Sequence, residues 1–453
     1  MIMKTIIRPE TEMKNSGIEW IGNIPQNWDA VQIRRVLLKD KNGIKIGPFG
    51  SALTNKTTGN DEYYVYSQAN LVSGDFSNTK NKVSQDVFNS LSNYEVVTGD
   101  VCLSMMGTIG KCRIIPHNIK KGIMDSHLIK IRLDNYNSRF FEYVYDKDNG
   151  GICFVQMQKE KKGSIMDGLN TSIVKGLYVT VPPLSEQQAI ADYLDKTCSK
   201  INEIIAEAKE SIDEYKELKR SVIFEAVTKG LDKNVEMKDS GIEWIGEIPN
   251  DAKLVPLKYL VSKAITDGTH QTPDYESSEN GSPFLSSKDI SSGKIDFSNI
   301  KYITKKLHEE LYRNVAPQIN DVLLAKNGTT GVAALVEKDM VFDIYVTLAL
   351  IRPDVTKVLP KYLLHGINCY VAKRQFDEHL LGIGVPNLHL SVIRNTKVII
   401  HNKNQQKKIA DFLDKRTAEI DDLIAEKESL INDLEAYKKS LIYEVVTGKR
   451  RVV

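Results

Sequence analysis

Apolar residues recur at alternating steps of four and three residues in two stretches of the chain. Ten such positions counted from Ile190, and ten counted from Ile409, each contain eight apolar side chains. A period of 3.5 residues over four to five heptads predicts a coiled-coil seam in each stretch. The predicted seams run through Ile190, Leu194, Thr197, Ile201, Ile204, Ala208, Ser211, Tyr215, Leu218 and Val222, and through Ile409, Leu413, Arg416, Ile420, Leu423, Lys427, Leu430, Leu434, Tyr437 and Leu441.

Local signals delimit both helices. A capping box that begins at Ser185 follows two prolines, and Asn402 or Asn404 can cap the second helix. Gly230 and Gly448 stand where the two helices should end. The first helix would be about 65 Å long at 1.5 Å per residue, so we expect it to bridge the domains on either side.

Much of the chain is present twice. Residues 13–25 and 237–249 differ at only two of thirteen positions, and residues 190–196 reappear with one change as 409–415. Repetition at a nearly constant offset predicts a tandem duplication. We expect the two helices to pair antiparallel, with the two globular portions related by an approximate two-fold axis. Duplex DNA is the commonest ligand of two-fold symmetry.

The globular portions contain short apolar runs separated by turns. In the first copy, residues 101–105 and 111–115 flank the turn Gly107–Gly110, and the second copy repeats this arrangement around Gly328–Gly331. Both patterns predict β-hairpins. The Gly-Thr-x-Gly turn suits phosphate binding through backbone N–H groups, although a hairpin explains the same glycines without a ligand.

These patterns predict an α+β (mixed α/β) chain with a pseudo-two-fold internal repeat, in which two long antiparallel coiled-coil helices join two similar globular domains. We place the first domain at residues 1–183 and its helix at 184–230. The second domain is placed at 231–401 and the second helix at 402–453. Because residues 225–240 lead from the first helix into the second domain, we expect the two ends of the chain to be neighbours.

Composition excludes several classes of protein. Hydrophobic residues make up 41% and charged residues 26%, which is typical of soluble globular chains. Five cysteines without a C-x-x-C pair, and eight histidines without ligand spacing, predict neither disulfides nor a metal site. No apolar run reaches membrane-spanning length and the start is unlike a secretory signal, so we expect a cytoplasmic protein with no membrane partner.

The distribution of charge separates the globular portions from the first helix. The net charge is +2 overall, but residues 1–183 carry +5 and residues 184–236 carry −4. We therefore expect nucleic-acid phosphates to meet the globular portions and the acidic helix to meet protein. In the second seam, Arg416 and Lys427 are candidates to pair with Glu203 or Glu207 of the first helix.

Loops rich in polar, amide and aromatic side chains are the candidate DNA-binding segments, because base edges are read by directed hydrogen bonds. For any single residue a solvated loop is the competing interpretation, and His270 is as well explained as an ordinary polar group. The candidate DNA-binding residues are Lys45, Lys56, Tyr64, Ser67, Gln68, Asn70, Ser104, Thr108, Thr269, His270, Gln271, Thr272, Tyr275, Ser286, Lys288, Lys326 and Asn327.

No catalytic motif is found. The chain has no P-loop, no Asn- or Asp-Pro-Pro-aromatic tetrapeptide, no G-x-S-x-G and no persuasive nuclease arrangement of carboxylates. We therefore predict that the chain is not an enzyme, with no catalytic residue, no metal and no cofactor of its own.

The W-I-G-x-I-P segments, the two Gly-Thr-x-Gly hairpins, residues 267–273 (DGTHQTP), residues 387–391 (NLHLS) and residues 182–188 (PPLSEQQ) together resemble the specificity subunit of type I restriction-modification systems. The resemblance spans essentially the full chain in two copies. It implies a DNA-reading subunit with two target-recognition domains, each of which reads one part of an asymmetric bipartite target. The helices would fix the length of the unread spacer.

The same resemblance implies the partners: double-stranded DNA, two methyltransferase subunits that carry S-adenosylmethionine, and, as a further possibility, two restriction subunits that use ATP and Mg²⁺. These cofactors are expected on the partner subunits only. The alternative is a two-headed protein-binding scaffold with a coiled-coil spacer and no DNA role, which fits the near-neutral net charge. Dependence of binding on salt separates the two, because DNA binding releases counterions.

Overall fold

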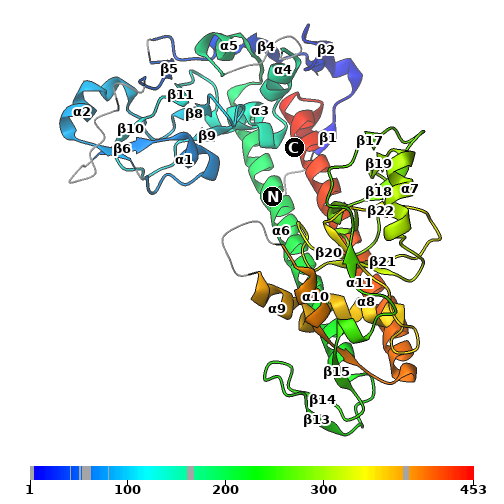
Figure 1. The fold of residues 1–453 in the computed structure, drawn as a ribbon. Coiled ribbons are helices and arrows are strands. Elements are labelled where there is room, and N and C mark those ends of the chain that lie inside the picture. Colours follow the sequence, from blue (N-terminus) through cyan, green and yellow to red (C-terminus); the bar gives the residue numbers. More distant parts are fainter. Residues whose placement is uncertain are drawn as a thin grey trace. The chain divides into compact units, whose positions relative to one another are not determined.

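The computed structural model describes residues 5–40, 42–49, 53, 63–79, 81–160, 168–380 and 387–453. The chain divides into two compact units (Figure 1). The first unit comprises residues 1–208 and 429–453, and the second comprises residues 209–428. Each unit therefore combines one globular portion with parts of both long helices.

Two sheets form the centre of the first unit. One is an antiparallel sheet in the order β5-β11-β8-β9, and the other, β10-β6-β7, contains the parallel pair β6/β10. The predicted hairpin of residues 101–115 is confirmed as β8–β9. The strands are β5 (Ile44–Ile46), β6 (Tyr63–Tyr66), β7 (Lys82–Val83), β8 (Val101–Ser104), β9 (Cys112–Ile114), β10 (Gly122–Met124) and β11 (Leu128–Ile131).

The second unit repeats this topology. Its antiparallel sheet has the order β16-β23-β20-β21, and its second sheet, β17-β19-β18-β22, contains the parallel pair β18/β22. The strands are β16 (Thr266–Asp267), β17 (Tyr275–Glu276), β18 (Ser282–Leu285), β19 (Lys301–Ile303), β20 (Val322–Ala325), β21 (Ala333–Leu335), β22 (Asp343–Ile344) and β23 (Leu348–Ile351). The predicted duplication of an α+β fold is thereby confirmed. All four residues of β8 and of β20 are buried, as expected of strands covered on both faces.

Smaller elements complete each unit. Short paired strands are β1 (Thr5–Ile7) with β25 (Arg450–Val452), β2 (Met13–Asn15) with β3 (Asn23–Pro25), β4 (Asp29–Gln32) with β12 (Tyr178–Val181), β13 (Met237–Asp239) with β14 (Glu247–Pro249), and β15 (Lys253–Pro256) with β24 (Lys397–Ile400). Short helices are α1 (Gln68–Ser73), α2 (Gln85–Ser90), α3 (Ser138–Tyr145), α4 (Ile152–Glu160), α5 (Thr171–Gly176), α7 (Lys305–Asn314), α8 (Pro360–Asn368), α9 (Tyr370–His379) and α10 (Leu390–Asn395).

The ends of the chain meet in the first unit, as predicted. Strand β1 pairs antiparallel with β25, with Thr5 opposite Val452. The adjacent segment is tied down by Arg8, which forms an ion pair with Glu186. The indole Nε1 of the buried Trp28 donates to the other carboxylate oxygen of Glu186 at 2.9 Å. One half-buried acid thus secures two parts of the N-terminal segment.

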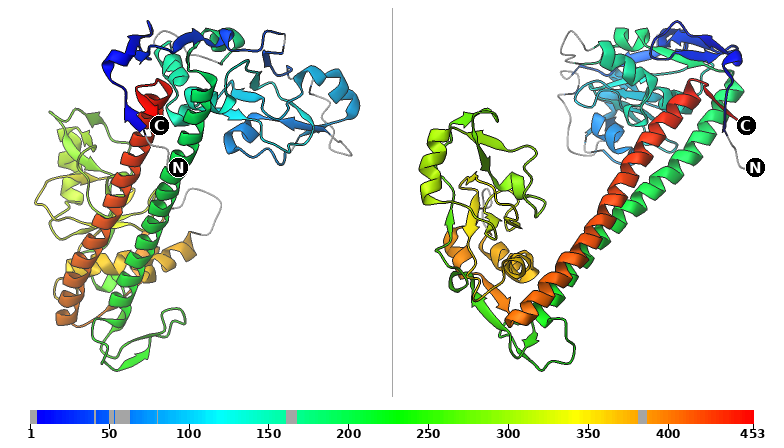
Figure 2. Two further views of the ribbon diagram at one scale, coloured as in Figure 1. Left: turned by 180° about the vertical axis from the view of Figure 1, so that it is seen from behind. Right: turned by 90° about the vertical axis from the view of Figure 1, so that its right-hand side faces the viewer.

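The two predicted long helices are α6 (Leu184–Lys229) and α11 (Lys403–Val446). Within the first unit, Lys438 Nζ donates to Asn202 Oδ1 at 2.9 Å, and within the second, Lys219 Nζ lies 2.6 Å from Asp421 Oδ1. The start of each helix therefore lies beside the end of the other, which confirms the antiparallel pairing (Figure 2).

The helix ends only partly follow the predicted caps. Asn402 caps α11, since its Oδ1 accepts a hydrogen bond from the backbone N–H of Gln405 at 3.0 Å. Gly230 and Gly448 follow the two helices with positive φ, as predicted. The prediction of a capping box at Ser185 is wrong, because α6 already begins at Leu184.

Parts of both predicted seams are wrong, because two predicted positions of the first seam (Ile204 and Leu218) and four of the second (Arg416, Leu423, Leu430 and Tyr437) are exposed. Ile201 and Ala208 are buried as predicted, but Ile204 is 44% exposed whereas Ile205 and Ile212 are buried. The error arises at the start of the helix. The buried residues Ile190, Leu194 and Cys198 follow one another at two successive four-residue steps, whereas the predicted pattern places a three-residue step after Leu194. A single extra residue moves every second seam position to the adjacent side of the helix.

The same one-residue shift occurs in the second helix, so the prediction that Arg416 lies in the seam is wrong. Thr417 is buried instead, and Arg416 NH1 pairs with Glu419 Oε2 of its own helix at 2.8 Å. Arg416 is therefore not a seam residue. Lys427 is half-buried.

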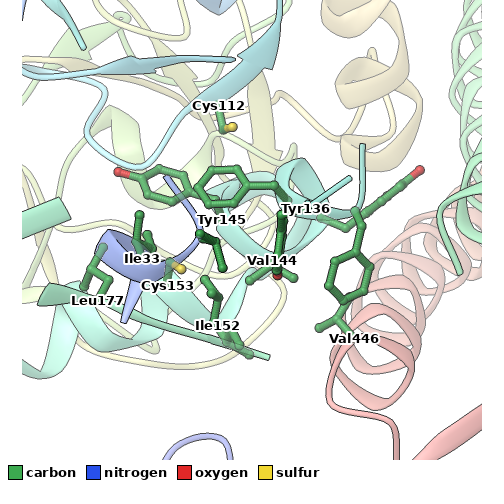
Figure 3. Packing of buried hydrophobic residues seen from close by; sticks show 14 of the residues in the cluster. Ile33, Cys112, Tyr136, Val144, Tyr145, Ile152, Cys153, Leu177 and Val446 are labelled. Atoms are coloured by element: carbon green, nitrogen blue, oxygen red, sulfur yellow. The ribbon is translucent and has the colours of Figure 1, made fainter. Parts of the chain in front are cut away.

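The core of each unit is closed by the end of a long helix. In the first unit, Val446 of α11 packs in a cluster with Tyr136, Tyr145 and Ile152 (Figure 3). The W-I-G-x-I-P segment covers this end, because the buried Ile21 and Ile24 join the same cluster and Tyr443 Oη donates to the carbonyl of Ile21 at 3.2 Å. Gly448 is required here, since a Cβ would lie 2.4 Å from Pro25.

Equivalent aspartates fasten the start of each long helix to its globular portion. In the first unit, Asp195 Oδ1 accepts hydrogen bonds from Arg139 Nε at 2.7 Å and Tyr143 Oη at 2.6 Å. In the second, Asp414 accepts from Lys361 Nζ and His365 Nε2, both at 2.7 Å. The hydrogen bond from His365 is the largest cause that lowers the pKa of Asp414 to about 2.

This pKa predicts a pH-dependent stability. A carboxyl group whose pKa is lowered by folding stabilises the protein above its ordinary pKa, and that contribution is lost as pH falls through the folded value. Asp414→Asn should therefore lower the free energy of unfolding at pH 6 by about 1 kcal/mol, allowing for solvent screening of this part-exposed group. The deficit should shrink as the pH falls from about 4 towards 2.

Urea unfolding monitored by circular dichroism between pH 6 and pH 3 measures this difference. Asp422→Asn on the exposed side of α11 is the matched control, for which no such difference is expected. A deficit of Asp414→Asn that stays constant across this range would contradict the prediction.

Candidate nucleic-acid interface

In the first unit, five of the predicted DNA-binding residues come together at the ends of β6 and β8. We call Ser67, Gln68, Asn70, Ser104 and Thr108 the first corner. Gln68 Nε2 donates to the carbonyl of Met106 at 2.7 Å and to Thr108 Oγ1 at 2.8 Å. Gln68 therefore joins the first turn of α1 to the Gly-Thr-x-Gly turn between β8 and β9.

Some residues of the first corner are buried and others are more accessible. Asn70 is 8% exposed, and its Oδ1 accepts from the backbone N–H of Ser67 at 3.0 Å. Its Nδ2 donates to the carbonyls of Asp75 and Asn78. Ser104 is fully buried and donates to the carbonyl of Thr108. Gln68 and Thr108 are half-buried and form the accessible part.

The second unit builds the same corner from partly different side chains. Ser286 is the N-cap after β18, and its Oγ donates to Asp289 Oδ2 at 2.9 Å. Thr329 of the second Gly-Thr-x-Gly turn donates through Oγ1 to the carbonyl of Ser287 at 3.4 Å. We call Ser286, Ser287, Lys288, Lys326, Asn327 and Thr329 the second corner.

Its lysines lie in different environments. Lys288 is more than half exposed, with Nζ 3.7 Å from Asp289 Oδ1. Lys326 is buried and forms an ion pair with Asp267 at the start of the neighbouring loop. Asn327 forms a β-bridge with Asn387, part of the N-L-H-L-S segment.

The predicted loop from Thr269 to Tyr275 runs beside β22. The backbone N–H of Thr269 donates to the carbonyl of Ile344 at 3.2 Å. His270 is 73% exposed, with Nε2 3.4 Å from Asp267 Oδ2, and Gln271 and Thr272 are also exposed. A pocket of about 340 Å³ opens between this loop, α7 and β22.

A glycine allows the loop to approach β22. A Cβ on Gly268 would lie 1.9 Å from the carbonyl oxygen of Ile344, and one on the equivalent Gly47 would lie 1.7 Å from that of Asp125. Both positions therefore require glycine, because no side chain fits against the neighbouring backbone.

The remaining predicted residues lie away from the corners. Tyr64 is buried in β6, and the ammonium groups of Lys82 and Lys120 lie 5.2 Å and 5.1 Å from its ring centroid. Lys45 in β5 lies over the ring of Tyr94, and Tyr275 is 48% exposed beneath Lys301. Lys56 lies outside the described residues.

The sequence did not reveal the connections that follow β10 and β22. In the first unit, His127 is 53% exposed, and its carbonyl accepts from the backbone N–H of Met105 at 3.0 Å. In the second, Thr347 Oγ1 accepts from the backbone N–H of Ser287 at 3.0 Å. Both connections therefore border a corner. The internal repeat could have revealed these connections in the sequence, because residues 125–132 and 345–352 share Leu, Ile and Arg at an offset of 220.

Two further observations concern the described residues. None of their helices combines the length and the apolar character that crossing a bilayer requires. No group of three or more His, Cys, Asp or Glu side chains among them could hold a metal ion.

Comparison with known families identifies the class of protein. Residues 40–214 and 272–433 match the family model described as the type I restriction modification DNA specificity domain. These two matches cover most of the chain and correspond to its two copies. The chain therefore belongs to this family.

Named relatives agree with this membership. The specificity subunit of the type I restriction enzyme MjaVIII from Methanocaldococcus jannaschii is 25% identical over 303 residues, which cover 65% of this chain and 67% of the relative. The specificity subunit of the type I restriction enzyme EcoBI from Escherichia coli is 22% identical over 302 residues, with 65% and 61% covered.

A solved structure shows the same fold. It comes from work on the complex assembly and conformational transition of the type I R-M system. The comparison covers 94% of this chain and 99% of the other, with a TM-score of 0.68 and 14% sequence identity.

The hydrogen bonds of Gln68 predict its role in holding the first corner together. Gln68→Ala removes both bonds to the turn, which should cost about 1 to 2 kcal/mol of local stability. Amide hydrogen exchange across residues 105–111 should become several-fold faster. Gln85→Ala at an exposed position of α2 is the matched control and should leave exchange in this segment unchanged. Equal exchange in the two variants would show that Gln68 does not restrain the turn.

Proposed function

We propose that this chain is the sequence-specific DNA-recognition subunit of a type I restriction-modification complex and that it reads an asymmetric bipartite target. The observation that carries the proposal is the pair of corners, which occupy equivalent places in two units of the same topology but present different side chains. Two equivalent scaffolds that present different polar groups suit the recognition of two different short DNA sequences, which we call words. The chain is a non-catalytic subunit that acts by positioning its partners, and we place it in the cytoplasm.

Base reading falls to the accessible groups of each corner. Both protons of Gln68 Nε2 are donated within the first corner, so its Oε1 is the group that can accept from the amino group of adenine or cytosine in the major groove. A lysine such as Lys288 matches the acceptors of guanine. Exposed Gln271 and Thr272 extend this surface in the second unit. The remaining predicted contacts belong to the same proposal, with buried Asn70 and Ser104 acting through the loops that they hold.

The two long helices fix the number of base pairs between the two words. They contain 46 and 44 residues, so each is roughly 65 to 70 Å long. A coiled-coil pair with a packed seam resists bending and sliding, because any slip would expose its apolar residues. Spacer length is therefore a property of helix length in this proposal.

Two methyltransferase subunits are the proposed protein partners, one for each unit. Beside the seam, the first unit exposes Ile204 (44%), Leu430 (40%) and Tyr437 (53%). The second unit exposes their repeat equivalents, among them Leu423 (40%) and Leu218 (41%). Large apolar side chains exposed at heptad spacing are typical of a surface that another helix covers.

The partners would supply the chemistry. The methyltransferase subunits would carry S-adenosylmethionine, and restriction subunits, where they join, would use ATP and Mg²⁺. A base must leave the helical stack before it is methylated, so a subunit that holds the duplex firmly on both sides of the site assists that step.

The proposal predicts the outcome of selecting bound duplexes from a random pool with this chain and its methyltransferase subunits. Enriched duplexes should contain two different words at one constant separation, and their binding should weaken steeply with salt. Deleting one heptad from each helix, residues 205–211 and the equivalent 424–430, should shorten the separation by about 3 base pairs and leave the words unchanged.

A single contiguous word, or two words at variable separation, would contradict the proposal. Deleting residues 205–211 alone serves as the control, because it shifts one seam against the other and should abolish selection rather than shorten the spacer. An intact spacer length after the paired deletion would show that the helices do not set it.

A further inference from the structure

Three lysines surround the aromatic start of β6 in the first unit. Lys82 Nζ lies 5.2 Å and Lys120 Nζ lies 5.1 Å from the ring centroid of Tyr64. Lys121, the next residue after Lys120, has its Nζ 5.8 Å from the ring of Tyr63 and 5.0 Å from that of Phe88. We call Lys82, Lys120 and Lys121 the lysine patch.

The aromatic rings hold these ammonium groups in place. Tyr63 and Phe88 stack with their centroids 4.2 Å apart, and the backbone N–H of Tyr64 donates to the carbonyl of Lys121 at 3.0 Å. An ammonium group over an aromatic face is attracted by the negative face of the ring. The patch is therefore partly ordered before any ligand arrives.

Among the described residues, no acid pairs with the patch. In the part of the chain that the structure describes, no ion pair involves any of the three lysines, although many other lysines and arginines are paired. Two ammonium groups over one ring lie within about 10 Å of each other, where like charges repel. An anion bound between them would relieve this repulsion.

The patch and the first corner occupy opposite ends of the same strand. Lys120 and Lys121 directly precede β10, which runs parallel to β6, whereas Ser67 and Gln68 directly follow β6. Four residues of strand separate them, or about 13 Å. A duplex whose base edges meet the first corner would therefore have backbone phosphates within reach of the patch, since phosphates follow one another at every base pair.

The second unit does not repeat the patch. Tyr302, Met340 and Val341 replace Lys82, Lys120 and Lys121, each at an offset of 220. Val341 is 51% exposed, so an apolar side chain stands where the first unit presents a charge. This difference agrees with the +5 charge of residues 1–183.

We propose that the lysine patch binds the phosphate backbone of duplex DNA and makes the first unit the main electrostatic anchor of the chain. The inference rests on the proposed function and adds an asymmetry to it. Phosphate contacts position the duplex without reading sequence, so the patch contributes affinity and salt dependence while the corners contribute specificity.

The test measures binding of the full chain to a random-sequence duplex of about 30 base pairs over a range of salt concentrations. Lys82→Gln, Lys120→Gln and Lys121→Gln are combined in one variant. The slope of log K against log salt should become shallower by about 2 to 3, because each phosphate contact contributes close to 0.9. Affinity at low salt should fall at least tenfold, and the triple Arg variant should restore both quantities.

The control variant combines Lys196→Gln, Lys200→Gln and Lys209→Gln, which remove the same charge from exposed positions of α6. Its slope should match that of the unaltered chain. Circular dichroism checks that each variant is folded. In selections with the methyltransferase subunits, the patch variant should enrich the same two words as the unaltered chain.

Three results would overturn the inference. If the patch and control variants have equal slopes while the unaltered chain still selects two words, the inference fails and the proposed function stands. If the patch variant selects a different word, the lysines read bases rather than phosphates. If the unaltered chain selects no sequence and its binding does not depend on salt, the proposed function fails and the inference fails with it.

Discussion

The core of each unit is completed by a helix from the other copy of the repeat. In the first unit, Leu441, Ile442, Val445 and Val446 of the second copy are buried beside residues of the first copy. The second unit buries Ile223, Ala226 and Val227 of the first copy in the same way. Four large apolar side chains contribute roughly 6 to 12 kcal/mol at most, which is comparable to the whole stability of a typical domain.

This exchange explains why the repeat is tandem and why the helices are antiparallel. A single copy would leave its own core open and the end of its helix uncovered. Joining two copies satisfies both needs at once, provided that each helix runs from its own globular portion to the core of the other copy. The W-I-G-x-I-P segment belongs to this arrangement, because Ile21 and Ile24 cover the end of the incoming helix. Its near-identity in the two copies reflects a shared packing task.

The corners and the lysine patch differ between the two units, whereas the core packing described above is the same in both. Residues that hold the loops, such as Asn70, Asp289 and the glycines at 47 and 268, are satisfied inside the protein and set the shape of each surface. The accessible groups around them differ between the two units. A duplicated scaffold can therefore present two different binding surfaces, one of them more basic than the other.

The sequence by itself determined the duplication, the two long helices, the hairpins and the family, because periodicity and motif spacing are local properties of the chain. It also placed Gln68 and Thr108 among the candidate residues, although they are distant along the chain. Only the tertiary structure decided which seam positions are buried, since the extra four-residue step before Cys198 depends on how α6 leaves the globular core. Likewise, Lys326 is sequestered by Asp267, and Lys120 is gathered with Lys82 around Tyr64, through contacts between segments whose distances no sequence pattern encodes.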